Sequence, residues 1–208
     1  WKLNATSVYT PSAPNYTTAL SFVTSESDYI TVPDSSDLQL VNTDFSISFW
    51  INPSASSSYI LMDKYGPGAA GWGVYLQSGN LRFLAYPSGF QTVTTVPQNV
   101  WTHILIVGDN SGDNLLCYKN GAEVYNSSYT LSISSNTTDL IIGSENGNSF
   151  YYNGLISNTA IYNSALTSSQ ASTLFNFGTP ETNISFSPTA WWKLDNTTTG
   201  IQDSSGNG

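Results

Sequence analysis

The stretch Phe45-Ser-Ile-Ser-Phe-Trp-Ile51 indicates the fold class, because apolar residues alternate along it with small polar ones. A period of two places one set of side chains on a buried face, which is the pattern of a β-strand. Segments of this kind recur along the chain between clusters of Gly, Asn, Ser and Pro. The sequence therefore predicts an all-β domain, a two-sheet antiparallel β-sandwich with at most one short helix.

The local patterns locate the elements of this sandwich. Tight hairpins are expected at Gln77-Ser-Gly-Asn80 and Lys119-Asn-Gly-Ala122, because Gly and Asn tolerate the positive φ of such turns. A short helix is expected at Ser168–Phe175, with Thr167 as its N-cap and one apolar side facing a sheet. The expected strands are Ala19–Phe22, Tyr29–Val32, Phe45–Ile51, Tyr59–Met62, Gly73–Gln77, Leu81–Ala85, Trp101–Val107, Leu115–Lys119, Asp139–Gly143, Asn153–Tyr162 and Ala190–Leu194.

The composition limits the partners of the domain. The 208 residues suffice for one full-sized core. Only 9% of the residues are charged, and the formal net charge of −9 disfavours contact with nucleic acid phosphates. No run of about 18 apolar residues is present, so we expect no insertion into a membrane.

The two ends of the chain resemble each other. Trp1-Lys-Leu-Asn4 is echoed by Trp192-Lys-Leu-Asp195. One interpretation is that a second copy of the domain begins at the C-terminus, and the other is that two edge strands share three residues by chance. We therefore divide the chain into a sandwich at 1–187 and a terminal strand, or the start of a following repeat or linker, at 188–208. Further copies of the chain, in tandem or as a homo-oligomer, are candidate partners.

Short motifs follow one another in a fixed order along the chain. They are Ser27-Asp-Tyr-Ile-Thr-Val-Pro-Asp34 with Leu38, Phe45–Ile51, Gly71-Trp-Gly-Val-Tyr-Leu76, Trp101-Thr-His-Ile104, Tyr118-Lys-Asn-Gly121, Ile142-Gly143, Tyr152-Asn-Gly-Leu-Ile156 and Ile161-Tyr-Asn-Ser-Ala-Leu166. This ordered set is similar to the laminin-G-like branch of the concanavalin A-like lectin/glucanase jelly rolls. The resemblance covers about residues 19–177 and implies two curved sheets in a non-catalytic module that binds glycans or proteins, often with a structural calcium ion. It also implies that Trp50, Trp101, Tyr152 and Ile161 pack in the core.

The residues that catalysis needs lack their partners. Glycoside hydrolysis uses two carboxylates at a fixed separation. Only Glu26 and Asp28 among the glutamate–acid pairs have a spacing of two, and they fall at a loop-to-strand junction. His103 follows Trp101 in an expected strand, and no Gly-x-Ser-x-Gly elbow accompanies it. We expect a structural histidine, a buried Cys117 and no enzymatic activity.

Calcium is the one cofactor that the loops suggest. Carboxylates and carbonyl oxygens supply its six to eight ligands. The best local cluster consists of Glu26, Asp28, Asp34 and Asp37, with Asp63 and Asp109–Asp113 as further loop candidates. The alternative is that these acids are simply solvated.

Two loops combine aromatic rings with amides and acids, a mixture that suits sugar binding. They are Tyr86-Pro-Ser-Gly-Phe-Gln91 and Glu145-Asn-Gly-Asn-Ser-Phe-Tyr151, and Trp72 is a further candidate. The alternative is that Phe90 and Phe150 only cover the edge of the sandwich. The candidate ligand contacts are Trp72, Tyr86, Phe90, Gln91, Glu145, Asn146, Asn148 and Tyr151.

Six Asn-x-Ser/Thr sequons are candidate glycosylation sites, although the composition alone would produce about as many. They begin at Asn4, Asn15, Asn126, Asn136, Asn183 and Asn196.

Two hypotheses follow for function. The first is a recognition or adhesion module, located outside the cell or on a cell or virion surface, that binds glycans or surface proteins. The second is a structural subunit of an extracellular filament or a virion, assembled through jelly-roll packing or strand exchange.

Overall fold

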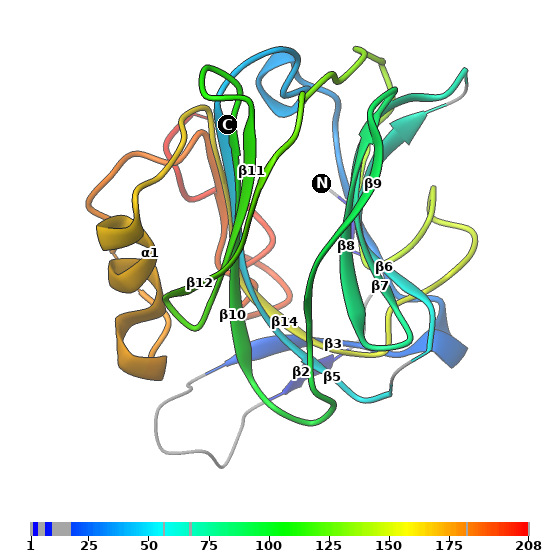
Figure 1. Cartoon of the computed structure of the whole chain (residues 1–208). Coiled ribbons are helices and arrows are strands. Elements are labelled where there is room, and N and C mark those ends of the chain that lie inside the picture. Colours follow the sequence, from blue (N-terminus) through cyan, green and yellow to red (C-terminus); the bar gives the residue numbers. More distant parts are fainter. Residues whose placement is uncertain are drawn as a thin grey trace.

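The computed structural model describes residues 2–3, 7–9, 18–55, 57–66, 68–181 and 183–207. Two antiparallel sheets pack face to face, as the alternating pattern predicts (Figure 1). The first sheet has the strand order β1-β4-β13-β6-β7-β8-β9. Its strands are β1 (Lys2–Leu3), β4 (Ile30–Val32), β6 (Tyr59–Gly66), β7 (Ala70–Gln77), β8 (Asn80–Tyr86), β9 (Gly89–Thr95) and β13 (Leu140–Ile142).

The second sheet has the order β12-β11-β10-β5-β14-β3-β2, and β15 pairs with β14 beside β3. Its strands are β2 (Ser7–Tyr9), β3 (Ala19–Phe22), β5 (Phe45–Pro53), β10 (Thr102–Asp109), β11 (Asn114–Lys119), β12 (Ala122–Ser128), β14 (Gly154–Tyr162) and β15 (Ala190–Trp192). Short 3-10 helices lie at Thr24–Glu26, Ser36–Leu38 and Asn176–Gly178.

The second sheet is covered on both faces. Its inner face shares the main core with the first sheet, where Phe45 and Phe83 pack with ring centroids 5.5 Å apart. Its outer face carries a second apolar cluster, in which Leu105 and Tyr162 pack with Leu174 of helix α1 (Ser168–Phe175). Figure 1 shows α1 outside this sheet, away from the first sheet. This double coverage explains why β5 and β10 are buried along almost their whole length.

The expected hairpins and helix are confirmed. Ser78 and Gly79, and likewise Asn120 and Gly121, adopt positive φ between paired strands. Helix α1 has the expected bounds and begins with a capping box, because the Thr167 hydroxyl accepts from the Gln170 N–H and the Gln170 side chain accepts from the Thr167 N–H. No described helix is long and apolar enough to cross a membrane.

The C-terminal segment packs on its own chain. Strand β15 pairs with β14, while Trp192, Leu194 and Ile201 are buried in the main core. The echoed N-terminal segment instead contributes β1, which pairs with β4 in the other sheet. The two similar segments therefore occupy edges of different sheets. A following repeat stays a prediction.

Several elements differ from the expected ones. Strands β1 and β2 were not expected. Strand β9 occupies Gly89–Thr95, where a ligand loop was expected from Tyr86-Pro-Ser-Gly-Phe-Gln91. Strand β12 was not expected, because its mostly exposed residues show no apolar alternation. Strand β6 continues to Gly66 and therefore contains Asp63, which was expected in a loop.

Candidate functional site

The outer face of the first sheet is the face that the described helix leaves open (Figure 1). Strand β7 alternates along this sheet: Trp72, Val74 and Leu76 are buried in the core. Gly71, Gly73 and Tyr75 therefore face outward. A Cβ atom at Gly73 would lie 2.5 Å from the Tyr75 ring, so the missing side chain at Gly73 is what lets that ring lie against the sheet.

Strand register brings a row of side chains together on this outer face. Tyr75 lies opposite Ile60 of β6 on one side and opposite Arg82 of β8 on the other. In the adjacent row, Leu84 lies opposite Phe90 of β9. Neighbours across strands approach closely enough for long side chains to touch. The pairing therefore assembles residues from four strands into one surface.

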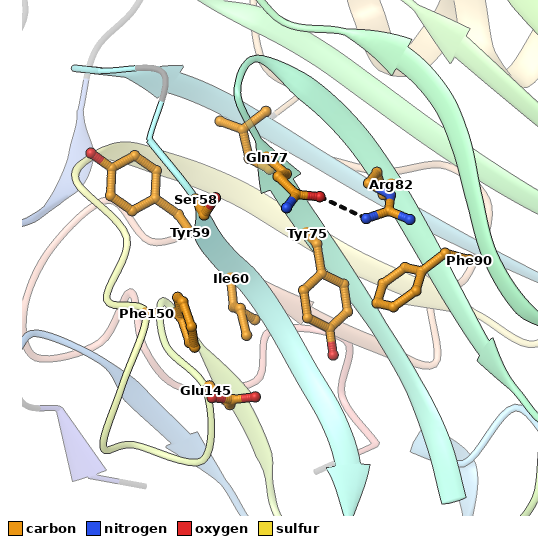
Figure 2. A pocket seen from close by; sticks show the side chains of 10 residues that line it. Ser58, Tyr59, Ile60, Tyr75, Gln77, Arg82, Phe90, Glu145 and Phe150 are labelled. Atoms are coloured by element: carbon orange, nitrogen blue, oxygen red, sulfur yellow. Dashed lines mark hydrogen bonds between the residues drawn. The ribbon is translucent and has the colours of Figure 1, made fainter. Parts of the chain in front are cut away.

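A cavity of about 260 Å³ opens in this surface, and we call it the aromatic slot. Figure 2 shows the Phe150 and Tyr75 rings on either side of Ile60, with Glu145 toward one end and Gln77 toward the other. Phe90 and Phe150 are 42% and 56% exposed, respectively, so both rings offer surface to a ligand. The residues that define the slot are Ile60, Tyr75, Gln77, Arg82, Phe90, Glu145 and Phe150.

The Phe90 ring is held in place by its neighbours. Tyr75 packs against it edge-on with centroids 5.1 Å apart, and the Arg82 guanidinium carbon lies 4.3 Å from its centroid. Arg82 Nη1 also donates to Gln77 Oε1 at 2.7 Å. These contacts fix an exposed ring before any ligand arrives, which lowers the entropy cost of binding.

One end of the slot belongs to a small hairpin at Glu145–Ser149. The Glu145 N–H donates to the Ser149 carbonyl at 2.8 Å, and the Ser149 hydroxyl donates to Glu145 Oε2 at 2.7 Å. The Asn146 N–H donates to Asp63 Oδ2 at 3.0 Å. Asp63 thus holds the hairpin from below, and it is itself only 2% exposed.

Asp63 carries a perturbed carboxyl group. Its pKa is raised from 3.8 to about 6, mainly by burial. Hydrogen bonds with the Asn146 and Tyr65 N–H groups and with the Tyr75 side chain lower it, and the like charge of Glu145 raises it. Burial and the two carboxylates also raise the pKa of Tyr75. The one salt bridge among the described residues joins Lys64 to Asp34, so no cation compensates the buried Asp63.

The structure brings Phe90 and Glu145, from the two expected ligand loops, into the same slot. The expectation for Trp72 is wrong, because its side chain is fully buried and its Nε1–H donates to the Leu38 carbonyl at 2.8 Å. Gln91 does not line the slot, since its Oε1 accepts from the Tyr125 hydroxyl at 3.1 Å. Period-two alternation places these two side chains on the inner side of their strands.

The other expected contacts lie beside the slot rather than in it. Tyr86 packs edge-on against Tyr65, and Tyr151 packs on Tyr29. Asn146 and Asn148 are exposed at the tip of the hairpin. Sequence reasoning missed Ile60, Tyr75, Gln77, Arg82 and Phe150 as ligand contacts, although Phe150 lies in one of the two expected loops. Alternation from the inward Trp72 is the signal that would have placed Tyr75 and Gln77 on the outer face.

The four expected calcium ligands do not form one group. Asp28 precedes β4 and Asp34 follows it, so this extended strand separates them. The Asp28 carboxylate accepts from the Val23 N–H, and Asp34 accepts from Lys64 at 2.6 Å. Among the described residues, His, Cys, Asp and Glu side chains form no group of three or more that could hold a metal ion. Glu26 and Asp37 therefore belong to no such group. The expected four-residue site is wrong, and calcium binding elsewhere stays a prediction.

His103 is a structural residue, as expected. It is fully buried, its Nε2 hydrogen-bonds to the Ser48 hydroxyl at 2.9 Å, and its ring packs on Trp50. Burial lowers the pKa of His103 to about 3. Its Nδ1 has no hydrogen-bond partner among the described residues, so the Ser48–His103 pair lacks the third member of a catalytic triad. Cys117 is also buried, which raises its pKa to about 12.

The sequons occupy different environments. Asn4 and Asn15 lie outside the described residues, and Asn126 and Asn183 are exposed. The Asn136 amide donates to the Lys64 and Ala70 carbonyls at 2.7 and 2.9 Å. The Asn196 amide donates to Asp195 and to Thr199, both at 2.9 Å. A glycan on either of the last two residues would replace one of these donated hydrogens.

The sequence matches a family profile over most of its length. Residues 24–172 match the profile of the concanavalin A-like lectin/glucanases superfamily. The chain belongs to this superfamily, which confirms the resemblance inferred from its motifs. No curated protein sequence matches the chain.

Solved structures with similar folds are distant in sequence. A Bacteroides ovatus protein proposed to bind carbohydrate has a TM-score of 0.69 at 18% identity, over 91% of this chain and 56% of its own. The binding domain of Paraclostridial Mosquitocidal Protein 1 has a TM-score of 0.63 at 23% sequence identity, over 85% of this chain and 47% of its own. Domain 4 of AbnA, an extracellular arabinanase from Geobacillus stearothermophilus, was solved in complex with arabinotriose. Its TM-score is 0.60 at 18% sequence identity, over 84% of this chain and 81% of its own. The chain thus spans about half the length of the first two structures, and these likenesses describe the fold.

Proposed function

We propose that this chain is a non-catalytic glycan-binding module that holds a sugar ring in the aromatic slot. The observation that carries the proposal is the pair of exposed rings, Phe90 and Phe150, beside a cavity with an apolar floor and polar ends. Binding sites for small molecules combine apolar walls with a few polar groups that fix orientation. Here Gln77 and Arg82 are the polar groups at one end, and Glu145 is the polar group at the other.

The carboxylates of the slot support binding rather than hydrolysis. Glu145 is the one carboxylate among the lining residues, whereas a glycosidase needs two that reach the scissile bond. Asp63 lies nearby, but it is 2% exposed and does not line the slot. Incubation with the bound oligosaccharides, followed by chromatography, tests this part: released sugars would refute it.

The comparisons add support of a general kind. One structure of similar fold is a protein proposed to bind carbohydrate. Another is a domain solved in complex with arabinotriose. The latter domain is part of an extracellular enzyme, and we infer that the present module also acts outside the cell or on a surface. Assembly with further copies stays an alternative, to be tested by deletion of 190–208 and measurement of folding and oligomeric state.

A glycan array with matched variants tests the proposed function. We expect the wild-type chain to bind and the double variant Phe90→Ala/Phe150→Ala to lose most of the signal, because both exposed walls are removed. Phe177→Ala is the control, since Phe177 is 94% exposed and is not a slot residue. Thermal unfolding of each variant shows whether the fold persists. Equal binding by the folded double variant would refute the assignment of the slot.

A further inference from the structure

A fully buried lysine, Lys64, lies on β6. It pairs with Trp72 of β7, whose side chain is in the main core, so Lys64 also points inward. Its Nζ donates to Asp34 Oδ1 at 2.6 Å, to Asn136 Oδ1 at 3.4 Å and to the Thr138 carbonyl. These contacts place an amine beside a side-chain amide and a carboxylate, away from bulk water.

The side-chain amide of Asn136 is held at both of its polar atoms. Its Oδ1 accepts from the Thr138 N–H at 3.0 Å and from the Thr138 hydroxyl at 2.6 Å. Its Nδ2 donates to the Lys64 and Ala70 carbonyls at 2.7 and 2.9 Å. Donors aimed at a carbonyl oxygen stabilise the negative charge that forms there when a nucleophile adds to the carbon. Thr138 therefore surrounds Asn136 Oδ1 as an oxyanion hole does.

Two glycines make room for this arrangement. A Cβ atom at Gly71 would lie 2.3 Å from Asn136 Nδ2, and one at Gly66 would lie 2.8 Å from Thr138 Cγ2. A larger residue at either position would push the segment 135–138 away from Lys64. The same segment lines a cavity of about 490 Å³, which gives a small product a path to solvent.

We propose that Lys64 and Asn136 react with each other to form an isopeptide bond, with Asp34 as the proton acceptor. The Asp34 carboxylate takes a proton from the Lys64 ammonium group, and the neutral Nζ adds to Asn136 Cγ. A second Nζ proton then passes to Nδ2 as the bond between Cγ and Nδ2 breaks, and Nδ2 leaves as ammonia. The ammonia takes the proton held by Asp34 and departs as ammonium, which restores the carboxylate. Nζ keeps one hydrogen in the new amide, and no other reactant is consumed.

The surroundings favour the product. The Lys64 side chain is 1% exposed, and a buried ammonium group is costly, whereas the amide that replaces it is neutral. The Asp34 side chain is 28% exposed, so its carboxylate regains water once Lys64 has lost its charge. Asp34 belongs to no metal-binding group among the described residues. The bond joins positions 72 residues apart and thereby restricts the unfolded chain.

Intact mass spectrometry of the purified whole chain, after incubation at neutral pH, tests the bond. We expect a mass lower than that of the sequence by one molecule of ammonia. Chymotryptic digestion and tandem mass spectrometry should identify a branched peptide that joins Lys64 to Asn136. Lys64→Arg keeps a positive charge beside Asp34, and it should have its full mass because a guanidinium group does not attack an amide. Lys119→Arg is the matched control and should keep the mass loss, since Lys119 Nζ donates to the Thr95 carbonyl.

Three results would overturn the proposal: full mass for the folded wild type, loss of ammonia without the branched peptide, or loss of water with Lys64 joined to Asp34. Asp34→Ala tests the proton acceptor. We expect this variant to have its full mass, and thermal unfolding shows whether it folds. Complete cross-linking in the folded variant would overturn the role of Asp34. Should Asp34→Ala fail to fold, the wild-type spectrum and its branched peptide still decide.

Discussion

Replacement of Asp63 by Asn should change how the global stability of the domain depends on pH. The pKa of Asp63 rises from 3.8 when unfolded to about 6 when folded, so between these values the folded state binds more protons. Stability from this group is therefore fully present below about pH 4 and is lost as pH rises through about 6. Asp63→Asn removes this dependence, because the amide has no proton to gain.

The magnitude follows from the same two values. A difference of about two pKa units corresponds to about 3 kcal/mol in the acid limit. Over the range from pH 5 to pH 7.5, the loss amounts to about 1 kcal/mol. An amide that faces a backbone N–H adds a cost of about 1–3 kcal/mol, but this cost is the same at every pH.

Urea unfolding at several pH values measures the effect as a difference between wild type and Asp63→Asn. The subtraction is essential, because His103 also contributes to the pH dependence. Its pKa is lowered to about 3 in the folded state, so its contribution to stability rises with pH, over the range in which the contribution of Asp63 falls. Asp44→Asn is the control, because Asp44 also accepts two backbone N–H groups, from Asn110 and Ser111. This variant should keep the pH dependence of stability that Asp63 causes. A wild-type-minus-Asp63→Asn difference that stays constant from pH 5 to pH 7.5 would refute the reasoning.

Three further predictions concern the slot and the sequons. Gly73→Ala should displace the Tyr75 ring, whose nearest atom lies 2.5 Å from the new Cβ. It should lower the free energy of unfolding, measured by thermal unfolding, by about 1–3 kcal/mol. It should also weaken binding on the glycan array. Unchanged stability and binding would contradict the packing described. Arg82→Gln removes a cation–π contact worth about 0.5–1 kcal/mol, so glycan titrations should show a few-fold weaker affinity with an unchanged fold. In a host that glycosylates, peptide mass spectrometry should find glycans on Asn126 and not on Asn136; the reverse pattern would refute the argument from hydrogen bonding.

The parts of the fold that local chemistry decides could be predicted from the sequence. The turns at Ser78–Gly79 and Asn120–Gly121 need positive φ, and residues that tolerate it stand there. Helix α1 begins where Thr167 and Gln170 can cap each other. Each of these features lies within a few residues, so no knowledge of the tertiary fold is needed.

Features that depend on strand register could not be predicted. The segment Tyr86–Gln91 was expected to be a ligand loop from its aromatic and amide side chains, yet Phe90 lies in β9 because pairing with β8 extends almost to the turn. Strand β12 forms although its mostly exposed residues lack an apolar face, since β11 supplies its backbone partners. Polar edge strands of this kind give only a weak alternation signal.

The slot itself shows the same limitation. Phe90 and Glu145 were expected as ligand contacts from the composition of two loops, but Tyr75 and Arg82 join them only through the register of β6, β7 and β8. Asp63 was expected in a loop, either as a candidate calcium ligand or as a solvated acid, and it is buried because β6 continues past Met62. Its burial, like its pKa, is a property of the assembled sheet.

Chemical-shift mapping by NMR is the most direct test of the central claim that the aromatic slot binds sugar. The isotope-labelled chain would be titrated with the oligosaccharide that gives the strongest signal on the array. We expect the shifted amides to cluster around Ile60, Tyr75 and Phe90, with little change near Phe177 on the far side of the second sheet. Shifts centred elsewhere, or no shifts with any oligosaccharide of the array, would contradict the account.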